Sequence, residues 1–158
     1  MNRGLCVALI ALHATDATAE TGFTVAAGGG VNVDAPFVAA HVGRRFARAP
    51  FVELYLDYSY DRPISEFSFQ TFGIGVRTYL ALSPRFELFH QAMVGFVVSS
   101  SGRGAVQDRQ IGERLLGPIL TQGIGLEMAI DRCWTAALAV STGTPVWLRP
   151  ELSVKYTF

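Results

Sequence analysis

The stretch Glu151-Leu-Ser-Val-Lys-Tyr-Thr-Phe158 alternates strictly between polar and apolar residues. Side chains on a β-strand point to opposite faces with a period of two, so the four apolar residues from Leu152 to Phe158 share one face. The charged and hydroxyl-bearing residues share the other face. This stretch therefore predicts a strand that separates an apolar surface from a polar one.

The same alternation recurs upstream in seven further segments, most clearly in Phe51–Tyr60. The predicted strands cover residues 23–31, 37–46, 51–60, 72–80, 86–98, 118–130, 134–142 and 151–158. Turn-forming residues such as Asp61-Arg-Pro63 separate them, and Ser99–Leu116 is predicted to be one long loop. Because short and longer connections alternate, we predict an all-β fold, an eight-stranded antiparallel up-and-down transmembrane β-barrel.

The distribution of charge indicates which face of this barrel meets lipid. The chain has 158 residues, typical of one domain, and is 50% hydrophobic and only 16% charged, with a mean hydropathy of +0.31. The even-numbered positions of the last six predicted strands contain no Asp, Glu, Lys or Arg. A soluble ligand-binding barrel also has one apolar face, but an eight-stranded lumen is too narrow for so many bulky side chains. The apolar face is therefore predicted to face lipid, and the charged face, which is rich in Gly and Ala, to line the lumen.

Residues 1–19 have the pattern of a secretory signal peptide. Arg3 precedes the apolar stretch Gly4–Leu12, and Ala17-Thr-Ala19 is a small-residue cleavage site. The alternative is a buried N-terminal helix. We expect a leader over 1–19, a barrel over 20–158, and export through the periplasm to the bacterial outer membrane.

A repeat suggests an ion-pair network inside the lumen. Thr71-Phe-Gly-Ile-Gly-Val-Arg77 is matched fifty residues later by Thr121-Gln-Gly-Ile-Gly-Leu-Glu127. Arg77 and Glu127 hold the same place in two strands that run in the same direction, both on the lumen face. We predict that they belong to one buried network, with Glu53, Glu87 and Lys155 as further members.

With the leader, the alternating strands and the ending Val154-Lys-Tyr-Thr-Phe158, the chain resembles small outer-membrane barrels of the outer-membrane protein A and opacity-protein kind. The resemblance implies that Tyr156 and Phe158 form the signal read by the barrel-assembly machinery. It also implies contact with outer-membrane lipids, including lipopolysaccharide, and a loop ligand whose nature is unknown. The expected role is structural or surface interaction, with a plugged, ion-paired lumen; a narrow pore for small solutes is an alternative.

A narrower resemblance is to the lipid A deacylases, which are also eight-stranded barrels. It is carried by Gln122-Gly-Ile-Gly-Leu-Glu-Met-Ala-Ile-Asp-Arg-Cys-Trp134. That family has a His two residues before a catalytic Ser, whereas this chain has Ala139-Val-Ser141. A serine without a base is a poor nucleophile, so Ser141 is a catalytic candidate only if the hydrolase alternative holds.

The remaining polar candidates are isolated. His90 and Gln122 have lipid-facing parity, where polar groups are costly; they are expected to bond each other or to mark a bulge that shifts the register. His41 is expected to be a satisfied lumen residue. No metal-ligand spacing or phosphate loop is present, and the net charge is zero, so no metal, no cofactor and no nucleic-acid partner is expected.

Overall fold

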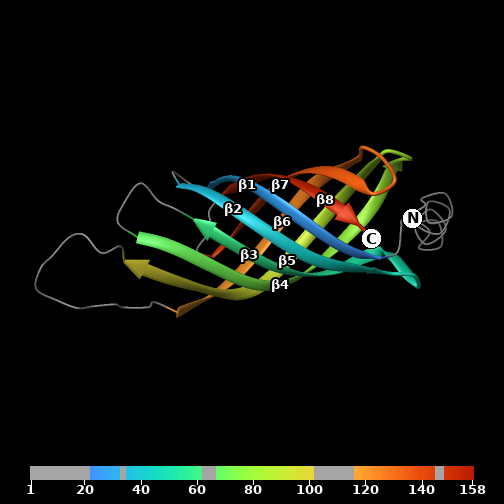
Figure 1. Cartoon of the computed structure of the whole chain (residues 1–158). Helices are drawn as coiled ribbons and strands as arrows, with labels where there is room; N and C mark the ends of the chain where they lie inside the picture. The colour runs from blue at the N-terminus through green and yellow to red at the C-terminus, as the bar shows by residue number, and fades with distance from the viewer. Residues whose placement is uncertain (1–21, 33–34, 62–66, 102–115, 145–147) are drawn as a thin grey trace, which may run out of the picture.

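The computed structural model describes residues 22–32, 35–61, 67–101, 116–144 and 148–158. They form eight strands, each antiparallel to the next: β1 (Phe23–Asn32), β2 (Ala35–Phe46), β3 (Ala49–Asp61), β4 (Phe67–Ser83), β5 (Phe86–Ser101), β6 (Leu116–Ala129), β7 (Trp134–Thr144) and β8 (Arg149–Thr157). β8 pairs with β1 and closes the barrel (Figure 1). The predicted eight-stranded antiparallel up-and-down barrel is confirmed.

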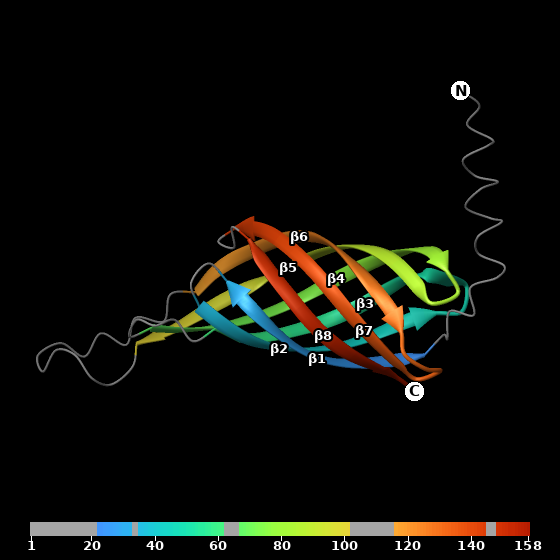
Figure 2. The same cartoon turned by 90° about the horizontal axis from the view of Figure 1, so that it is seen from above.

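The two ends of the barrel differ. The connections 47–48, 84–85 and 130–133 lie at the end where β1 begins and β8 finishes, which we call the turn end (Figure 2). At the opposite end, the loop end, β1, β3, β5 and β7 finish. In outer-membrane barrels, short turns face the periplasm and longer loops face outward.

The sheet extends farther toward the loop end than the apolar pattern predicted. Ser99–Ser101 continue β5 and pair with Phe67–Phe69 of β4, while Leu116 already pairs with Val98. The boundaries predicted for the long loop were therefore wrong, because a ladder of backbone hydrogen bonds does not need an apolar face. Residues 102–115 and the predicted signal peptide, 1–19, lie outside the described residues.

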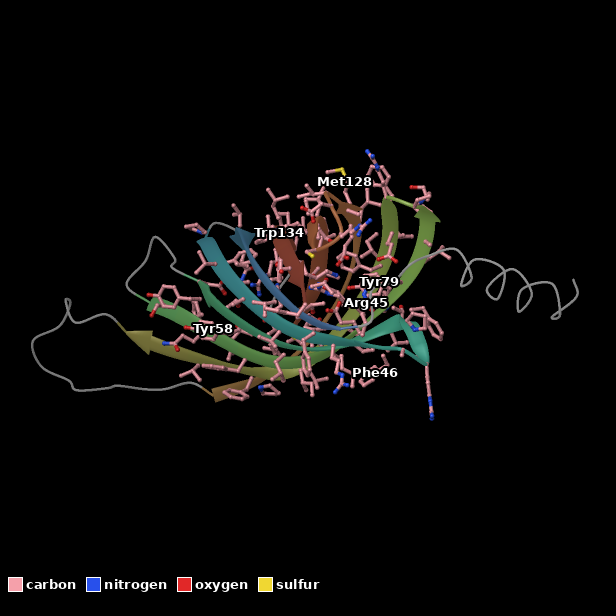
Figure 3. The ribbon with its side chains drawn as sticks, turned by 45° about the vertical axis from the view of Figure 1, so that its right-hand side comes forward. Arg45, Phe46, Tyr58, Tyr79, Met128 and Trp134 are labelled. Atoms are coloured by element: carbon pink, nitrogen blue, oxygen red, sulfur yellow. The ribbon has the colours of Figure 1, made fainter. Side chains whose placement is uncertain are left out.

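Large apolar side chains cover the outer surface. Leu54, Ile74 and Leu120 are all exposed there, as the parity of their strands predicted. Aromatic side chains gather near both ends: Trp134, Tyr156 and Phe158 pack together at the turn end, and Tyr58, Phe72 and Phe96 toward the loop end. Tyr58 and Trp134 are exposed, and Figure 3 shows Met128 above the ribbon and Phe46 below it. Aromatic belts of this kind are typical of barrels at the two membrane interfaces.

The fifty-residue repeat has a packing explanation. Gly75 and Gly125 occupy equivalent places in the two copies and pair across the ladder with Tyr55 and Phe89 respectively. Each aromatic ring lies where a Cβ atom on the glycine would be. A glycine thus makes room for a large ring inside a narrow lumen, and both rings are buried.

Candidate functional site in the barrel lumen

A cluster of charged side chains crosses the lumen near the turn end. It contains three carboxylates, three cations and one phenol contributed by six strands, namely Arg45, Glu53, Arg77, Tyr79, Glu87, Glu127 and Lys155. We call it the turn-end cluster. All of these side chains are buried except Glu87, whose side chain is 23% exposed. Equal numbers of opposite charges make the cluster neutral overall.

Glu127 is the most connected carboxylate. Lys155 Nζ donates to both of its oxygens, at 2.7 and 2.6 Å. Arg45 Nη2 donates to Glu127 Oε2 at 3.3 Å and to Glu87 Oε2 at 2.8 Å. Arg77 Nη1 lies 4.0 Å from Glu127 Oε1. Glu127 therefore faces all three cations, with Lys155 nearest.

Tyr79 links the cations to Glu53. Arg45 Cζ lies 3.6 Å from the centre of the Tyr79 ring, and Figure 3 shows the two side chains together inside the barrel. The Tyr79 hydroxyl donates to Glu53, as does the hydroxyl of Thr24. Lys155 Nζ is 3.8 Å from Glu53 Oε2. Each buried carboxylate thus has both a charged partner and hydrogen-bond donors, which burial of a charge requires.

A second ionic group lies farther toward the loop end. His41 Nε2 is 2.7 Å from Glu151 Oε1, and His41 Nδ1 is 2.6 Å from Asp57 Oδ1. The Nδ1 contact has the distance of an ion pair but is not aligned as a hydrogen bond. The imidazole therefore bridges β3 and β8 from its place on β2.

The five residues predicted to share a network, Arg77, Glu127, Glu53, Glu87 and Lys155, all lie in the turn-end cluster. Sequence reasoning missed Arg45 and Tyr79. The alternation along their strands could have identified both as lumen residues, since Arg45 shares the face of His41 and Tyr79 shares the face of Arg77.

Ser141 is also in the lumen, and among the described residues no basic side chain bonds its hydroxyl. Its Oγ accepts a hydrogen bond from Gln91 Nε2 at 2.7 Å, and Gln91 Oε1 accepts one from Arg77 Nε at 2.9 Å. A side-chain amide cannot take a proton from a serine, so this arrangement does not activate Ser141 as a nucleophile.

His90 and Gln122 are exposed on the outer face. His90 pairs with Ile124 and Gln122 with Ala92, so the two polar residues lie diagonally across β5 and β6. The β5–β6 register is continuous, and no hydrogen bond joins the two side chains in the described strands. Neither a bulge nor a mutual bond accounts for their position.

At the end of β8, Tyr156 packs edge-on against both Trp134 and Phe158. The Phe158 amide donates to Phe23 O at 2.9 Å, which extends the ladder between β8 and β1. Phe158 is 75% exposed. Both residues assigned to the assembly signal therefore lie on the outer surface at the turn end.

Within the described ranges, no group of three or more His, Cys, Asp or Glu side chains is arranged to hold a metal ion. The residues that the structure describes include no helix long and apolar enough to cross a membrane.

A closed barrel satisfies every backbone group without water, and this one combines an apolar outer face, aromatic belts and strand charges that lie in the lumen, apart from Arg44 near the turn end. These features define the fold of a transmembrane β-barrel. Among solved structures, the chain is similar to the N-terminal β-barrel domain of Pseudomonas aeruginosa OprF, with a TM-score of 0.69, 15% identity, and coverage of 87% of this chain and 98% of that one.

Two further structures have the same fold. Neisserial surface protein A matches with a TM-score of 0.58 and 13% identity, over 87% of this chain and 98% of that one. Ail, the attachment invasion locus protein of Yersinia pestis, matches with a TM-score of 0.52 and 12% identity, over 87% and 99%. No family model matches the sequence, and no curated protein matches it. The chain thus has the fold of small eight-stranded outer-membrane barrels.

Proposed function

We propose that this chain is an outer-membrane β-barrel protein with a structural or surface-interaction role, and that the turn-end cluster closes its lumen. The observation that carries the proposal is the neutral cluster itself, in which side chains from six strands meet across the lumen. An eight-stranded lumen is just wide enough for its own side chains or for one small ligand. A pathway for solutes would have to break several buried ion pairs.

The rival role as a narrow pore is tested by conductance in planar lipid bilayers. The wild-type barrel should give no discrete conductance steps. Replacing both Arg45 and Tyr79 with alanine should raise the conductance, because it removes the stacked pair that fills the lumen beside Glu53. The control is Phe46→Ala on the outer face, which should leave the conductance unchanged. Steady conductance of the wild-type protein, unaffected by the double substitution, would contradict the proposal.

The hydrolase alternative is tested separately with purified barrel and lipid A. Mass spectrometry should show no loss of acyl chains, since the Ser141 hydroxyl contacts the Gln91 amide instead of a base. Deacylated lipid A from the wild type, absent with Ser141→Ala, would establish the hydrolase instead.

The location and assembly of the protein are part of the same proposal. Export with a cleaved leader over 1–19 would deliver the chain to the barrel-assembly machinery, and its apolar face would then contact outer-membrane lipids, including lipopolysaccharide. Phe158→Ala removes the ring that packs on Tyr156 and should lower the yield of folded barrel in outer-membrane fractions. Yields equal to wild type would argue against a role for Phe158 in assembly.

A surface-interaction role places the ligand at the loop end, the end that faces outward in such barrels. Ail, a protein of the same fold, has been solved in complex with a heparin analogue, sucrose octasulfate. That complex supports the proposal that a barrel of this fold can bind a ligand.

A further inference from the structure

Arg44 is the one charged strand residue, within the part of the chain that the structure describes, that lies on the outer face of the barrel. Arg44 is exposed, whereas its neighbour Arg45 is buried in the turn-end cluster. The other charged strand residues point into the lumen. A charged side chain that faces hydrocarbon is costly, so the position of Arg44 calls for a partner on the membrane side.

The guanidinium of Arg44 lies toward the turn end of the apolar outer face. Arg44 comes two residues before Phe46, where β2 ends, and it pairs with Phe23, where β1 begins. Its Cζ lies 4.9 Å from the centre of the Phe23 ring and 5.8 Å from the centre of the Phe46 ring. Because Phe46 follows Arg44 toward the turn end, the side chain reaches in that direction. Long cationic side chains extend in this way from an apolar surface toward lipid headgroups.

The positive charge of Arg44 has no carboxylate partner among the described residues. The ion pairs formed by those residues all belong to the lumen. The faces of the Phe23 and Phe46 rings attract the cation, but they supply no oxygen acceptors for its N–H groups. An anion outside the barrel could therefore bind the guanidinium between the two rings.

The exposed charges of the turns at this end are mostly positive. Asp131 is an exposed carboxylate there, and its Oδ1 already accepts hydrogen bonds from the amides of Cys133 and Trp134, both at 2.8 Å. The exposed cations of the same three turns are Arg48, Arg85 and Arg132. Arginines at a membrane surface attract anionic lipids, so the turn end as a whole favours an anionic leaflet.

We propose that Arg44, held between the rings of Phe23 and Phe46, binds the phosphate group of an anionic phospholipid in the leaflet at the turn end. The planar guanidinium presents pairs of N–H donors that match two phosphate oxygens. The acyl chains would pack on the apolar surface around the site, where Phe23 is 55% and Leu54 is 47% exposed. The inference rests on the proposed function, which makes this leaflet the periplasmic one.

The test uses the full chain folded in dodecyl maltoside micelles, which contain no phosphate. Mobility on unheated gels checks folding first, and a chain that does not fold there would count against the membrane barrel itself. The probes are dihexanoyl phosphatidylglycerol, dihexanoyl phosphatidylcholine, dihexanoylglycerol and inorganic phosphate. Binding is measured at about 0.15 M salt, where distant charges are screened, by native mass spectrometry and by the NMR signals of the arginine Nε–H groups.

We expect phosphatidylglycerol to bind saturably and to shift the Nε–H signal that is lost in Arg44→Lys. Phosphatidylcholine should bind about threefold more weakly or less, because its own ammonium group cancels the charge that attracts arginine. Inorganic phosphate should bind at least about tenfold more weakly than phosphatidylglycerol, because it has no acyl chains to bury. Dihexanoylglycerol has no phosphate and should leave the signal in place.

Three variants separate a site from general attraction. Arg44→Gln should weaken the binding of phosphatidylglycerol about fivefold or more. Phe46→Leu keeps an apolar side chain but removes one of the two rings, and should weaken binding severalfold. The matched control is Arg132→Gln, which makes the same change of charge in an exposed turn at the same end and should bind within about twofold of the wild type.

Four results, each obtained with a folded barrel, would overturn the inference and leave the proposed function standing. Wild-type affinity in Arg44→Gln would place the lipid elsewhere. An equal loss in Arg44→Gln and Arg132→Gln would mean general attraction by the turn end. Equal affinity for the two phospholipids would mean that the apolar surface binds them without help from the charge. Inorganic phosphate bound as tightly as phosphatidylglycerol would mean a site for the free ion.

Discussion

Glu127 is the carboxylate whose loss should disturb the lumen most. It accepts two hydrogen bonds from Lys155, at 2.6 and 2.7 Å, and lies 3.3 Å from Arg45 Nη2 and 4.0 Å from Arg77 Nη1. Glu127→Leu would leave three buried cations opposite two carboxylates. Removing one partner of a buried ion pair typically costs about 3–5 kcal/mol, and we expect a loss of unfolding free energy in that range.

The distances also predict which second substitution should compensate. With an effective dielectric constant of about 20, Coulomb's law gives roughly 6 kcal/mol for charges 2.6 Å apart and roughly 4 kcal/mol at 4.0 Å. Lys155→Met should therefore couple to Glu127→Leu more strongly than Arg77→Met does, by about 2 kcal/mol. The variant lacking both Glu127 and Lys155 should recover much of the loss, because its remaining charges balance again.

The assay is reversible urea unfolding of the barrel in lipid vesicles, followed by tryptophan fluorescence and by mobility on unheated gels. Both double-mutant cycles are measured under the same conditions, with Leu126→Ala on the outer face as a control for a change on the same strand. Coupling to Arg77 as strong as coupling to Lys155, or losses that simply add, would refute the reasoning.

Three further predictions concern the two faces of the barrel. Leu54→Arg places a charge on the outer surface and should cost about 2–4 kcal/mol near the bilayer midplane; a cost near zero in lipid refolding titrations would mean that this surface does not meet lipid. Gly125→Ala forces a methyl group against the ring that covers this glycine and should lower the free energy of unfolding by about 1–3 kcal/mol. In Gly117→Ala the methyl group meets an ordinary contact at 3.6 Å, so this free energy should change little. Equal losses of unfolding free energy in the two variants would contradict the packing argument. Replacing both His90 and Gln122 with leucine should raise stability in lipid, and a loss measured by the same unfolding titration would show that these exposed polar groups have a partner in the membrane.

The alternation of apolar and polar residues along the chain was sufficient to predict the barrel. Leu54 and Ile74 are exposed and Glu53 and Arg77 are buried, as the parity of their strands required. This information is local, because neighbouring side chains on a strand always point to opposite faces. The strand ends toward the loops were less predictable: Ser99–Ser101 pair through their backbone and carry no apolar signal.

Which lumen side chains meet was decided only by the tertiary structure. Lys155 reaches Glu127 across β7, where the lumen residue Ala137 pairs with Glu127 and is small enough to leave the space open. Arg77 faces Glu127 across β5. Its Nε donates a hydrogen bond to Gln91 on that strand, so its guanidinium lies farther from Glu127 than the Lys155 ammonium does. The alternation along a strand decides whether a side chain points into the lumen. Which other side chains it meets there depends on the register of all the strands between them and on the volume of the side chains that lie in the gap. Only the closed barrel as a whole sets that register and that space.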